Sequence, residues 1–331
     1  MIRVPLSIQE ASREDQPDWV EPQLATLTRD RFCDPAWIFE RKFDGERCLA
    51  FRRGGRVRLL TRNRKPADSA YPELAEALVA QAADDFIVDG EVVAFDGDVT
   101  SFELLQRRIH LRDPLLARRS GVTVFYYIFD LLHADGRAVR ELPLLERKRI
   151  LRRVLSFADP LRLAVHRATD GEAYWRAACE KGWEGVIAKR GAAPYRPGRS
   201  RDWLKFKCEN AQEFVIGGYT DPQGSRHGFG ALMLGCYDGA GRLVYAGKVG
   251  TGFDEKTLHA MHDTLVSIER NTPPFERGKL PHSRVHWVEP LLVGQVAFTE
   301  WTADGQLRHP RFQGLRRDKD PSEVVRERPN P

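Results

Sequence analysis

Residues 40–47 (ERKFDGER) place a lysine directly after a short apolar run and surround it with acids and arginines. A lysine amine is a nucleophile only when it is neutral, and cationic neighbours or a bound metal ion lower its pKa toward that state. Lys42 is therefore the candidate covalent nucleophile, and we expect nearby cations to lower its pKa. Residues 42–45 alone would also fit a hairpin turn made by Asp44 and Gly45, with the lysine in water.

Transfer of a nucleotidyl group to Lys42 would require carboxylates for a divalent metal ion and cations for the phosphates. Glu91 and Glu184 each stand beside a glycine at the edge of an apolar run. In that position a carboxylate can face a cleft while its neighbours fill the core, although each acid alone would also fit a turn. Glu91 and Glu184 are the candidate metal ligands.

Three further lysines lie on predicted strands. Lys205 and Lys207 are two residues apart, which puts both ammonium groups on one face of a strand. Lys189 closes the run that begins at Glu184, and it would also fit a solvated strand end. A half-buried strand with an outward lysine row explains the same spacing. If the strands share a cleft, the three ammonium groups converge on one anion and help to lower the pKa of Lys42.

Composition limits the class of protein. A chain of 331 residues is long enough for about two domains. Hydrophobic residues make up 42% and charged residues 30%, which is typical of globular proteins. There is no apolar run of about 18 residues and no signal-peptide pattern, so we expect a cytoplasmic protein with no membrane association. The net charge of +5 and the clustered arginines permit an anionic partner.

The five cysteines, at positions 33, 48, 179, 208 and 236, are widely separated and form no Cys-x-x-Cys pair. This spacing suggests neither a disulfide framework nor a structural zinc site. Any metal ion is therefore expected on oxygen ligands or to arrive with the substrate.

Residues 1–209 read as one α+β domain with largely antiparallel sheets, because strands and helices mix without regular βαβ alternation. Residues 1–35 look like an extended lead-in. The expected strands are 37–42, 48–53, 57–61, a pair within 86–96 interrupted at Gly90, 122–132, 185–189 and 203–207. The expected helices are 73–82, 101–110, 144–154 and 172–181.

Residues 210–331 have a different character and form the second predicted domain. Strands are expected at 213–219, 231–237, 243–249, 293–301 and near Leu307, with a helix at 254–268. About five strands with one helix between the third and fourth is the order of an OB-fold β-barrel.

The ordered motifs carry a family resemblance. They are KFDGER at 42–47, TRN at 61–63, DGE at 89–91, FDLL at 129–132, EGVIAK at 184–189, WLKFK at 203–207 and RHPRFQGLRRDK at 308–319. Together they resemble the nucleotidyltransferase motifs of ATP-dependent DNA ligases. The last stretch is similar to that of the bacterial end-joining group, the ligase domain of ligase D and its stand-alone relatives. The resemblance extends from about residue 20 to residue 325.

This resemblance implies a three-step reaction with ATP and Mg²⁺ or Mn²⁺. Lys42 would attack the α-phosphate of ATP and form lysyl-AMP, AMP would pass to the 5′-phosphate of a DNA nick, and the 3′-hydroxyl would displace AMP. The backbone of Glu40 would bind the adenine edge and Phe129 would stack on its face, although Phe129 would equally fit the core of a buried strand. Arg47 and Arg62 would contact the ribose, the AMP phosphate or the DNA 5′-phosphate.

The remaining roles concern the metal ion and the phosphates. The resemblance implies that Glu91 contacts a ribose hydroxyl or the metal ion and that Glu184 joins the metal site. Lys205 and Lys207 would hold the α-phosphate, and Lys189 would contribute to nucleotide binding.

In the second domain, Arg316, Asp318 and Lys319 would orient the pyrophosphate leaving group. The barrel would then have to close over the nucleotide and later move away, with a hinge near residues 208–212.

Partners and alternatives follow from the same resemblance. The expected substrate is nicked or broken duplex DNA, bound by a monomer. The end-binding protein Ku and primase-like or phosphoesterase modules are the expected partners in double-strand break repair. A GTP-dependent RNA capping guanylyltransferase or RNA ligase shares the lysine motif, and a non-catalytic nucleic-acid-binding protein could share the barrel and the basic clusters.

Overall fold

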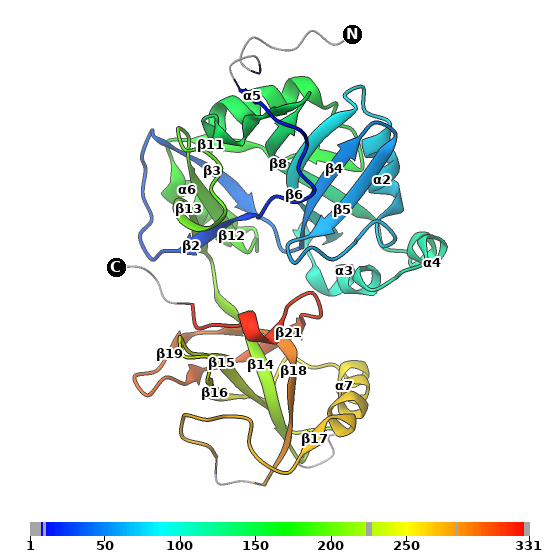
Figure 1. The fold of residues 1–331 in the computed structure, drawn as a ribbon. Helices are drawn as coiled ribbons and strands as arrows, with labels where there is room; N and C mark the ends of the chain where they lie inside the picture. The colour runs from blue at the N-terminus through cyan, green and yellow to red at the C-terminus, as the bar shows by residue number, and fades with distance from the viewer. Residues whose placement is uncertain (1–7, 9–10, 223–226, 282–283, 328–331) are drawn as a thin grey trace. The chain divides into compact units, whose positions relative to one another are not determined.

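The computed structural model describes residue 8 and residues 11–222, 227–281 and 284–327 (Figure 1). The chain divides into two compact units, of which the first ends at Cys208 and the second begins at Glu209. Among the described residues, no helix combines the length and the apolar character needed to cross a lipid bilayer.

The first unit contains two sheets. The larger sheet has the strand order β1-β9-β8-β6-β4-β5, with β10 paired to β8 and β7 to β6. Its strands are β1 (Ser12–Arg13), β4 (Glu46–Arg53), β5 (Arg56–Thr61), β6 (Asp85–Asp96), β7 (Val99–Thr100), β8 (Val124–Ala134), β9 (Arg137–Ala138) and β10 (Leu161–Leu163). The smaller sheet has the order β11-β3-β12-β13-β2. Its strands are β2 (Gln23–Leu27), β3 (Trp37–Lys42), β11 (His166–Ala168), β12 (Gly185–Arg190) and β13 (Gly198–Lys207).

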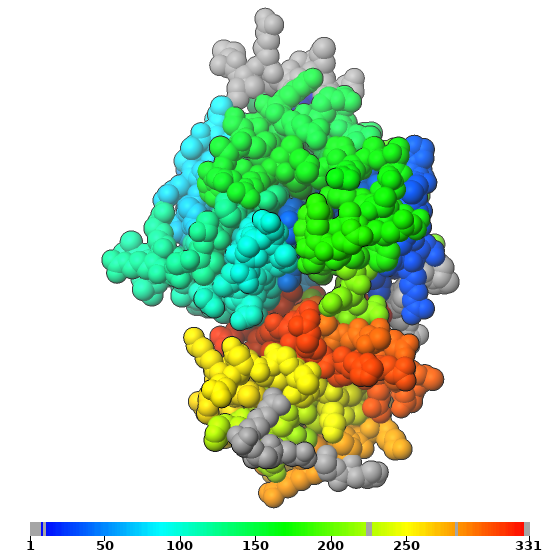
Figure 2. Space-filling view, turned by 180° about the vertical axis from the view of Figure 1, so that it is seen from behind, coloured from blue at the N-terminus to red at the C-terminus, as the bar shows by residue number. Residues whose placement is uncertain are grey.

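Helices cover the outer face of each sheet. They are α2 (Pro72–Val79), α3 (Phe102–Ile109), α4 (Pro114–Arg119), α5 (Leu144–Val154) and α6 (Gly171–Glu180), with a 3₁₀ turn at Val139–Glu141. Side chains of α2, α3 and α5 form one core with the larger sheet. Tyr174 and Ala178 of α6 form another core with Phe39 and Phe206 of the smaller sheet. Helix α4 protrudes from the side of the unit (Figures 1 and 2), which leaves its Leu115 64% exposed.

The inner faces of the two sheets meet each other. Leu49, Phe51 and Phe129 of the larger sheet share a buried cluster with Trp203 of β13 and with Tyr195. Because strand side chains alternate, charged residues two or four positions from these apolar ones also project between the sheets. The space between the sheets therefore holds both a packed apolar core and the charged residues described below.

Local sequence patterns account for most of these elements. Strand β3 and helix α5 have the predicted bounds, and the Ser101 hydroxyl caps α3 by accepting from the Leu104 amide. Two predictions were wrong. The stretch 86–96 is one continuous strand, because Gly90 lies at a register shift rather than a turn. The lead-in contains β2, which pairs in parallel with β13 and completes the smaller sheet.

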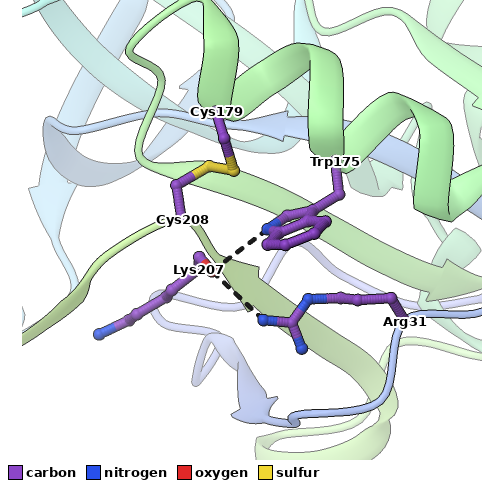
Figure 3. The surroundings of a disulfide bond; sticks show 5 residues. All are labelled: Arg31, Trp175, Cys179, Lys207 and Cys208. Carbon is purple, nitrogen blue, oxygen red and sulfur yellow. Dashed lines mark hydrogen bonds between the residues drawn. A yellow bond between two sulfur atoms is a disulfide. The ribbon is translucent and has the colours of Figure 1, made fainter. Parts of the chain in front are cut away.

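The prediction of no disulfide was also wrong, because Cys179 and Cys208 are bonded. The two residues are 29 positions apart in the chain, but their Cα atoms lie only 5.2 Å apart (Figure 3). Spacing along the chain could not reveal this pair, since helix α6 and strand β13 bring the two cysteines together only in the tertiary fold. Cys33, Cys48 and Cys236 are not part of a disulfide.

The second unit is built on the sheet β16-β15-β14-β18-β17, with β21 paired to β18, and a separate pair β19-β20. Its strands are β14 (Asn210–Thr220), β15 (Leu232–Tyr237), β16 (Leu243–Val249), β17 (Glu269–Arg270), β18 (Val285–Phe298), β19 (Glu300–Trp301), β20 (Leu307–Arg308) and β21 (Arg311–Leu315). Helix α7 (Glu255–Ser267) follows the third strand, as expected for an OB-fold, and a 3₁₀ turn lies at Pro321–Glu323. Strand β21 was not predicted.

A fully buried ion pair anchors helix α5 to strand β8. The Arg147 guanidinium donates to both oxygens of Asp130 at 2.7 and 2.8 Å, and neither side chain is exposed. Arg147 also donates to the carbonyls of Leu142 and Ala193 at 2.6 and 3.0 Å. Burying two charges is costly, and only this dense set of hydrogen bonds offsets the loss of hydration.

We expect Arg147→Met to destabilise the first unit by about 3–5 kcal/mol, because the Asp130 carboxylate would remain buried without its partner. Urea unfolding followed by tryptophan fluorescence measures this loss. The matched control is Arg149→Met on the same helix, whose side chain is 60% exposed and which should change the free energy of unfolding by less than about 0.5 kcal/mol. Equal effects of the two substitutions would contradict the assigned role of the buried pair.

Candidate active site

Strand β12 lies between β3 and β13 and aligns the predicted lysines. Gly185 pairs with Lys42 on one side and with Lys207 on the other. Two residues further along β12, Ile187 pairs with Glu40 and with Lys205. Since alternate residues of a strand share a face, the three strands bring Lys42, Lys205 and Lys207 onto one face of the smaller sheet.

A glycine is required at the centre of this row. A Cβ atom on Gly185 would lie 2.0 Å from the carbonyl oxygen of Phe206, and the residue has a φ of +147°. Both features favour glycine over any residue with a side chain. The close approach of the two backbones also keeps the space between Lys42 and Lys207 clear of a side chain.

The amine of Lys42 forms an ion pair with the carboxylate of Glu184, which precedes β12. The two side chains are 19% and 23% exposed, so the pair borders solvent without facing bulk water. Burial alone would lower the pKa of Lys42, but Glu184, with smaller contributions from Asp44 and Glu91, raises it above the ordinary value. The expectation that cations lower this pKa was therefore wrong for the free protein, because the nearest charges are acids.

Arg47 is held rigidly at the back of the site. Its guanidinium donates to both oxygens of Asp89, each at 2.5 Å, and the Tyr195 hydroxyl donates to the same carboxylate at 2.6 Å. Burial opposes the charge of Arg47, but Asp89 raises its pKa and keeps it cationic. The backbone amide of Arg62 donates to the Arg47 carbonyl at 3.1 Å. The two arginines predicted to bind phosphate are therefore neighbours through their backbones.

The acids around Lys42 form a suitable donor set for a hard divalent cation. Glu91 pairs in register with Arg47 on the neighbouring strand, and its charge acts on Lys42 together with that of Glu184. Carboxylate oxygens are the ligands that Mg²⁺ and Mn²⁺ prefer. The described residues contain no group of three or more His, Cys, Asp or Glu side chains arranged for a metal ion. Such a cation would therefore have to take further ligands from water or phosphate.

Glu40 and Lys189 belong to a buried charge cluster rather than to a solvated strand end. The Glu40 carboxylate lies 2.5 Å from the Lys148 amine and 2.8 Å from the Lys189 amine, and all three side chains are at most 3% exposed. Burial would raise the pKa of Glu40, but the two lysines lower it. Burial, reinforced by the charge of Lys148, lowers the pKa of Lys189 to about 8. The alternative in which Lys189 faces solvent is thus excluded.

Phe129 packs in the core between the sheets. Its ring is 7% exposed and makes an edge contact with the Trp203 ring at 5.9 Å between centroids. The Lys189 amine lies 4.1 Å from the centroid of the Phe129 ring and the Arg47 guanidinium 4.5 Å from it. In the free protein these two cations therefore flank the Phe129 ring. Stacking of this ring on adenine remains a prediction.

The second unit holds the other predicted residues in ion pairs of its own. Arg316 donates to both carboxylate oxygens of Asp318 at 3.0 and 2.9 Å. The Lys319 amine lies 3.7 Å from a carboxylate oxygen of Glu213 on β14. These contacts hold the long cationic side chains in place on the second unit.

Sequence reasoning missed several residues that support the site. Asp89 and Tyr195 hold Arg47 in place by hydrogen bonds, and Lys148 forms an ion pair with Glu40. Ile187 lies between Glu40 and Lys205 on the sheet face that carries Lys42. Alternation along β12 could have indicated Ile187. No local signal marks Lys148, whose helix contacts the site only through the tertiary fold.

The lowered pKa of Lys189 can be tested by lysine side-chain NMR as a function of pH. We expect one amine to titrate near pH 8, to disappear in Lys189→Met, and to titrate at higher pH in Lys148→Met, where a neighbouring positive charge is removed. The exposed lysine at position 181 supplies the control, since Lys181→Met should leave this titration unchanged. Titration of every lysine above pH 10 would contradict the buried cluster.

Comparison with known proteins identifies the family. Residues 22–207 match the ATP dependent DNA ligase domain, and residues 225–319 match the ATP dependent DNA ligase C terminal region. The multifunctional non-homologous end joining protein LigD of Pseudomonas aeruginosa is 38% identical over 322 residues, covering 95% of this chain and 37% of the relative. The DNA ligase of Methanocorpusculum labreanum is 31% identical over 295 residues, covering 86% of this chain and 52% of the relative.

A solved structure agrees with these sequence matches. Mycobacterial DNA ligase D complexed with ATP and MES is 35% identical, with a TM-score of 0.66, and the match covers 92% of this chain and 98% of that one. The chain spans about 37% of the length of the LigD relatives. These matches favour a DNA ligase over a capping enzyme or a binding protein without catalysis, and the chain belongs to the ATP-dependent DNA ligase family.

Proposed function

We propose that this chain seals nicks in duplex DNA by forming a lysyl-AMP intermediate at Lys42. The observation that carries the proposal is the position of Lys42, which is ion-paired to Glu184 and lies on the same sheet face as Lys205 and Lys207. In this proposal the nucleophile comes from β3, the two phosphate-binding lysines come from β13, and Glu184 directly precedes β12 between them. Family membership supports ATP as the nucleotide.

In the first step, the amine of Lys42 would attack the α-phosphorus of ATP. A P–N bond would form while the bond to the pyrophosphate oxygen breaks, and the amine would lose its protons to solvent. Before ATP binds, the Glu184 carboxylate orients the Lys42 amine and raises the pKa of that amine, which keeps it protonated. Lys205 and Lys207 would hold the α-phosphate by charge-assisted hydrogen bonds.

Glu184 and Glu91 would hold a divalent cation, Mg²⁺ or Mn²⁺, when one is bound. That cation would supply positive charge that competes with Lys42 for Glu184 and favours the neutral amine. Arg47 and Arg62 would then contact the ribose, the AMP phosphate or the DNA 5′-phosphate. The adenine pocket would be lined by the Glu40 backbone, Lys189 and Phe129.

The DNA substrate and the partners are also part of this proposal. Relatives named for non-homologous end joining support broken or nicked duplex DNA as the substrate. Primase-like or phosphoesterase modules would be further partners in that repair. The end-binding protein Ku would recruit the ligase to broken ends.

Replacing the nucleophile tests the first step. We expect Lys42→Ala and Lys42→Arg to form no protein-AMP adduct, because alanine lacks the amine and a guanidinium stays protonated. Intact-protein mass spectrometry after incubation with ATP detects the adduct, and pyrophosphate should remove it from the wild-type protein. Lys181→Arg, an exposed substitution, is the matched control. Accumulation of AMP on Lys42→Arg would overturn the assignment.

Arg316 and Lys319 of the second unit are expected to act in the reaction with ATP but not in the final sealing step. Arg316→Ala and Lys319→Ala should slow adduct formation by about 100-fold, since each removes a cation that would orient pyrophosphate. Sealing of a DNA nick that already carries AMP should change by less than about threefold. The exposed neighbour Arg317 supplies the control, Arg317→Ala. Equal losses in both reactions would contradict a role confined to the pyrophosphate step.

A further inference from the structure

The disulfide lies where the chain leaves the first unit. Cys179 is in the last turn of α6, and Cys208 directly follows the last residue of β13. Cys208 is also the residue at which the first unit ends. Both cysteines are half-buried. Figure 3 shows the disulfide joining α6 to the chain at the end of β13.

The bond closes a covalent loop around part of the proposed active site. The loop of residues 179–208 contains Glu184, Lys189, Lys205 and Lys207. Within it, the Cys208 amide donates to the Glu184 carbonyl at 3.1 Å, and the Glu184 carboxylate pairs with Lys42. The disulfide therefore fixes the chain immediately beyond the site.

Lys207 has anchors that do not depend on the disulfide. Its carbonyl accepts from Trp175 Nε1 at 3.2 Å and from an Arg31 guanidinium nitrogen at 3.3 Å, as Figure 3 shows. The Arg31 guanidinium also lies 4.7 Å from the centroid of the Trp175 ring. Together with the pairing of β12 and β13, these contacts would keep Lys207 in place after reduction of the bond.

The next residues belong to the second unit. The Glu209 carboxylate lies 3.9 Å from Arg311, and the Asn210 side-chain amide donates to the Thr299 carbonyl at 2.7 Å. The change from one unit to the other thus occurs between Cys208 and Glu209. Of the two residues at this junction, only Cys208 is fixed to the first unit by a covalent bond across the fold.

We propose that Cys179 and Cys208 form a reversible thiol–disulfide site that controls the freedom of the connection between the two units. In the oxidised form residue 208 is tied to α6, so rotation must occur in the residues after it. In the reduced form residue 208 joins the hinge and widens the range of motion. The functional consequence rests on the proposed ligase reaction, in which the second unit must change position between steps.

A protein or small-molecule dithiol would supply the electrons. One thiolate of the reductant attacks a sulfur of the pair, the S–S bond breaks, and a mixed disulfide forms. The second thiolate of the reductant then displaces the remaining cysteine. Cys179 and Cys208 gain two electrons and, through solvent, two protons, and the reductant leaves as a disulfide.

The first experiment tests the bond and the junction without relying on activity. Alkylation of the denatured full-length chain should label three cysteines before reduction and all five after it. Hydrogen exchange of the folded protein should become at least threefold faster in peptides that span residues 207–212 after reduction by dithiothreitol. In the double variant Cys179→Ser/Cys208→Ser, these peptides should exchange at the rate seen in reduced wild type, and dithiothreitol should not change that rate. Five labelled cysteines after treatment with oxidised glutathione, or unchanged exchange, would overturn the proposal.

The second experiment tests the consequence for ligation. Reduction should speed multiple-turnover sealing of nicked DNA severalfold while single-turnover formation of the AMP adduct changes by less than twofold. The double serine variant should match reduced wild type, and the matched control Cys33→Ser, at an exposed free cysteine, should keep the full response to reductant. Equal changes in both reactions, or a change in neither, would overturn the proposal. If no adduct forms in any sample, the ligase assignment fails, while the exchange experiment still decides on the redox site.

Discussion

Backbone pairing of β12 with both β3 and β13 is the constraint on which the site depends. The register places Gly185 between Lys42 and Lys207, and Ile187 between Glu40 and Lys205. Neighbouring strands are about 4.8 Å apart, so the cationic side chains of Lys42 on β3 and of Lys205 and Lys207 on β13 lie within reach of one phosphate group. A shift of one residue in either pairing would turn these side chains to the face that packs against α6.

Charge balance between the two sheets explains how this register is tolerated. Four cations of the first unit have an acid beside them: Arg47 has Asp89, Arg147 has Asp130, and Lys148 and Lys189 share Glu40. An isolated charge in this space would be strongly unfavourable, whereas a paired one with good hydrogen bonds can be retained. The Arg147–Asp130 pair and the three side chains of the Glu40 cluster are at most 3% exposed, while Arg47 is 17% exposed and the Lys42–Glu184 pair borders solvent. In the proposed reaction, the more exposed charges would exchange partners with the nucleotide and a metal ion, and the buried pairs would hold the architecture.

The junction between the units adds a covalent constraint to this electrostatic one. The disulfide and the hydrogen bonds to the Lys207 carbonyl fix the end of β13, and the first contacts of the second unit begin one residue later. In the proposed reaction, a rigid anchor at this point would keep Lys205 and Lys207 in register with Lys42 while the second unit reorients. The same anchor would make the junction sensitive to the redox state of two cysteines.

The sequence alone determined the local pattern of this protein. The apolar run of β3, the alternation on β13 and the cap at Ser101 predicted these strands and a helix, because such features depend on neighbouring residues. The order of motifs from Lys42 to Lys319 predicted the family. Only the tertiary structure decided the sign of the pKa shift at Lys42, the burial of Lys189 against Glu40 and Lys148, and the bond between Cys179 and Cys208. The reason is physical: a pKa, a buried ion pair and a disulfide each depend on distances in space between residues that lie far apart along the chain.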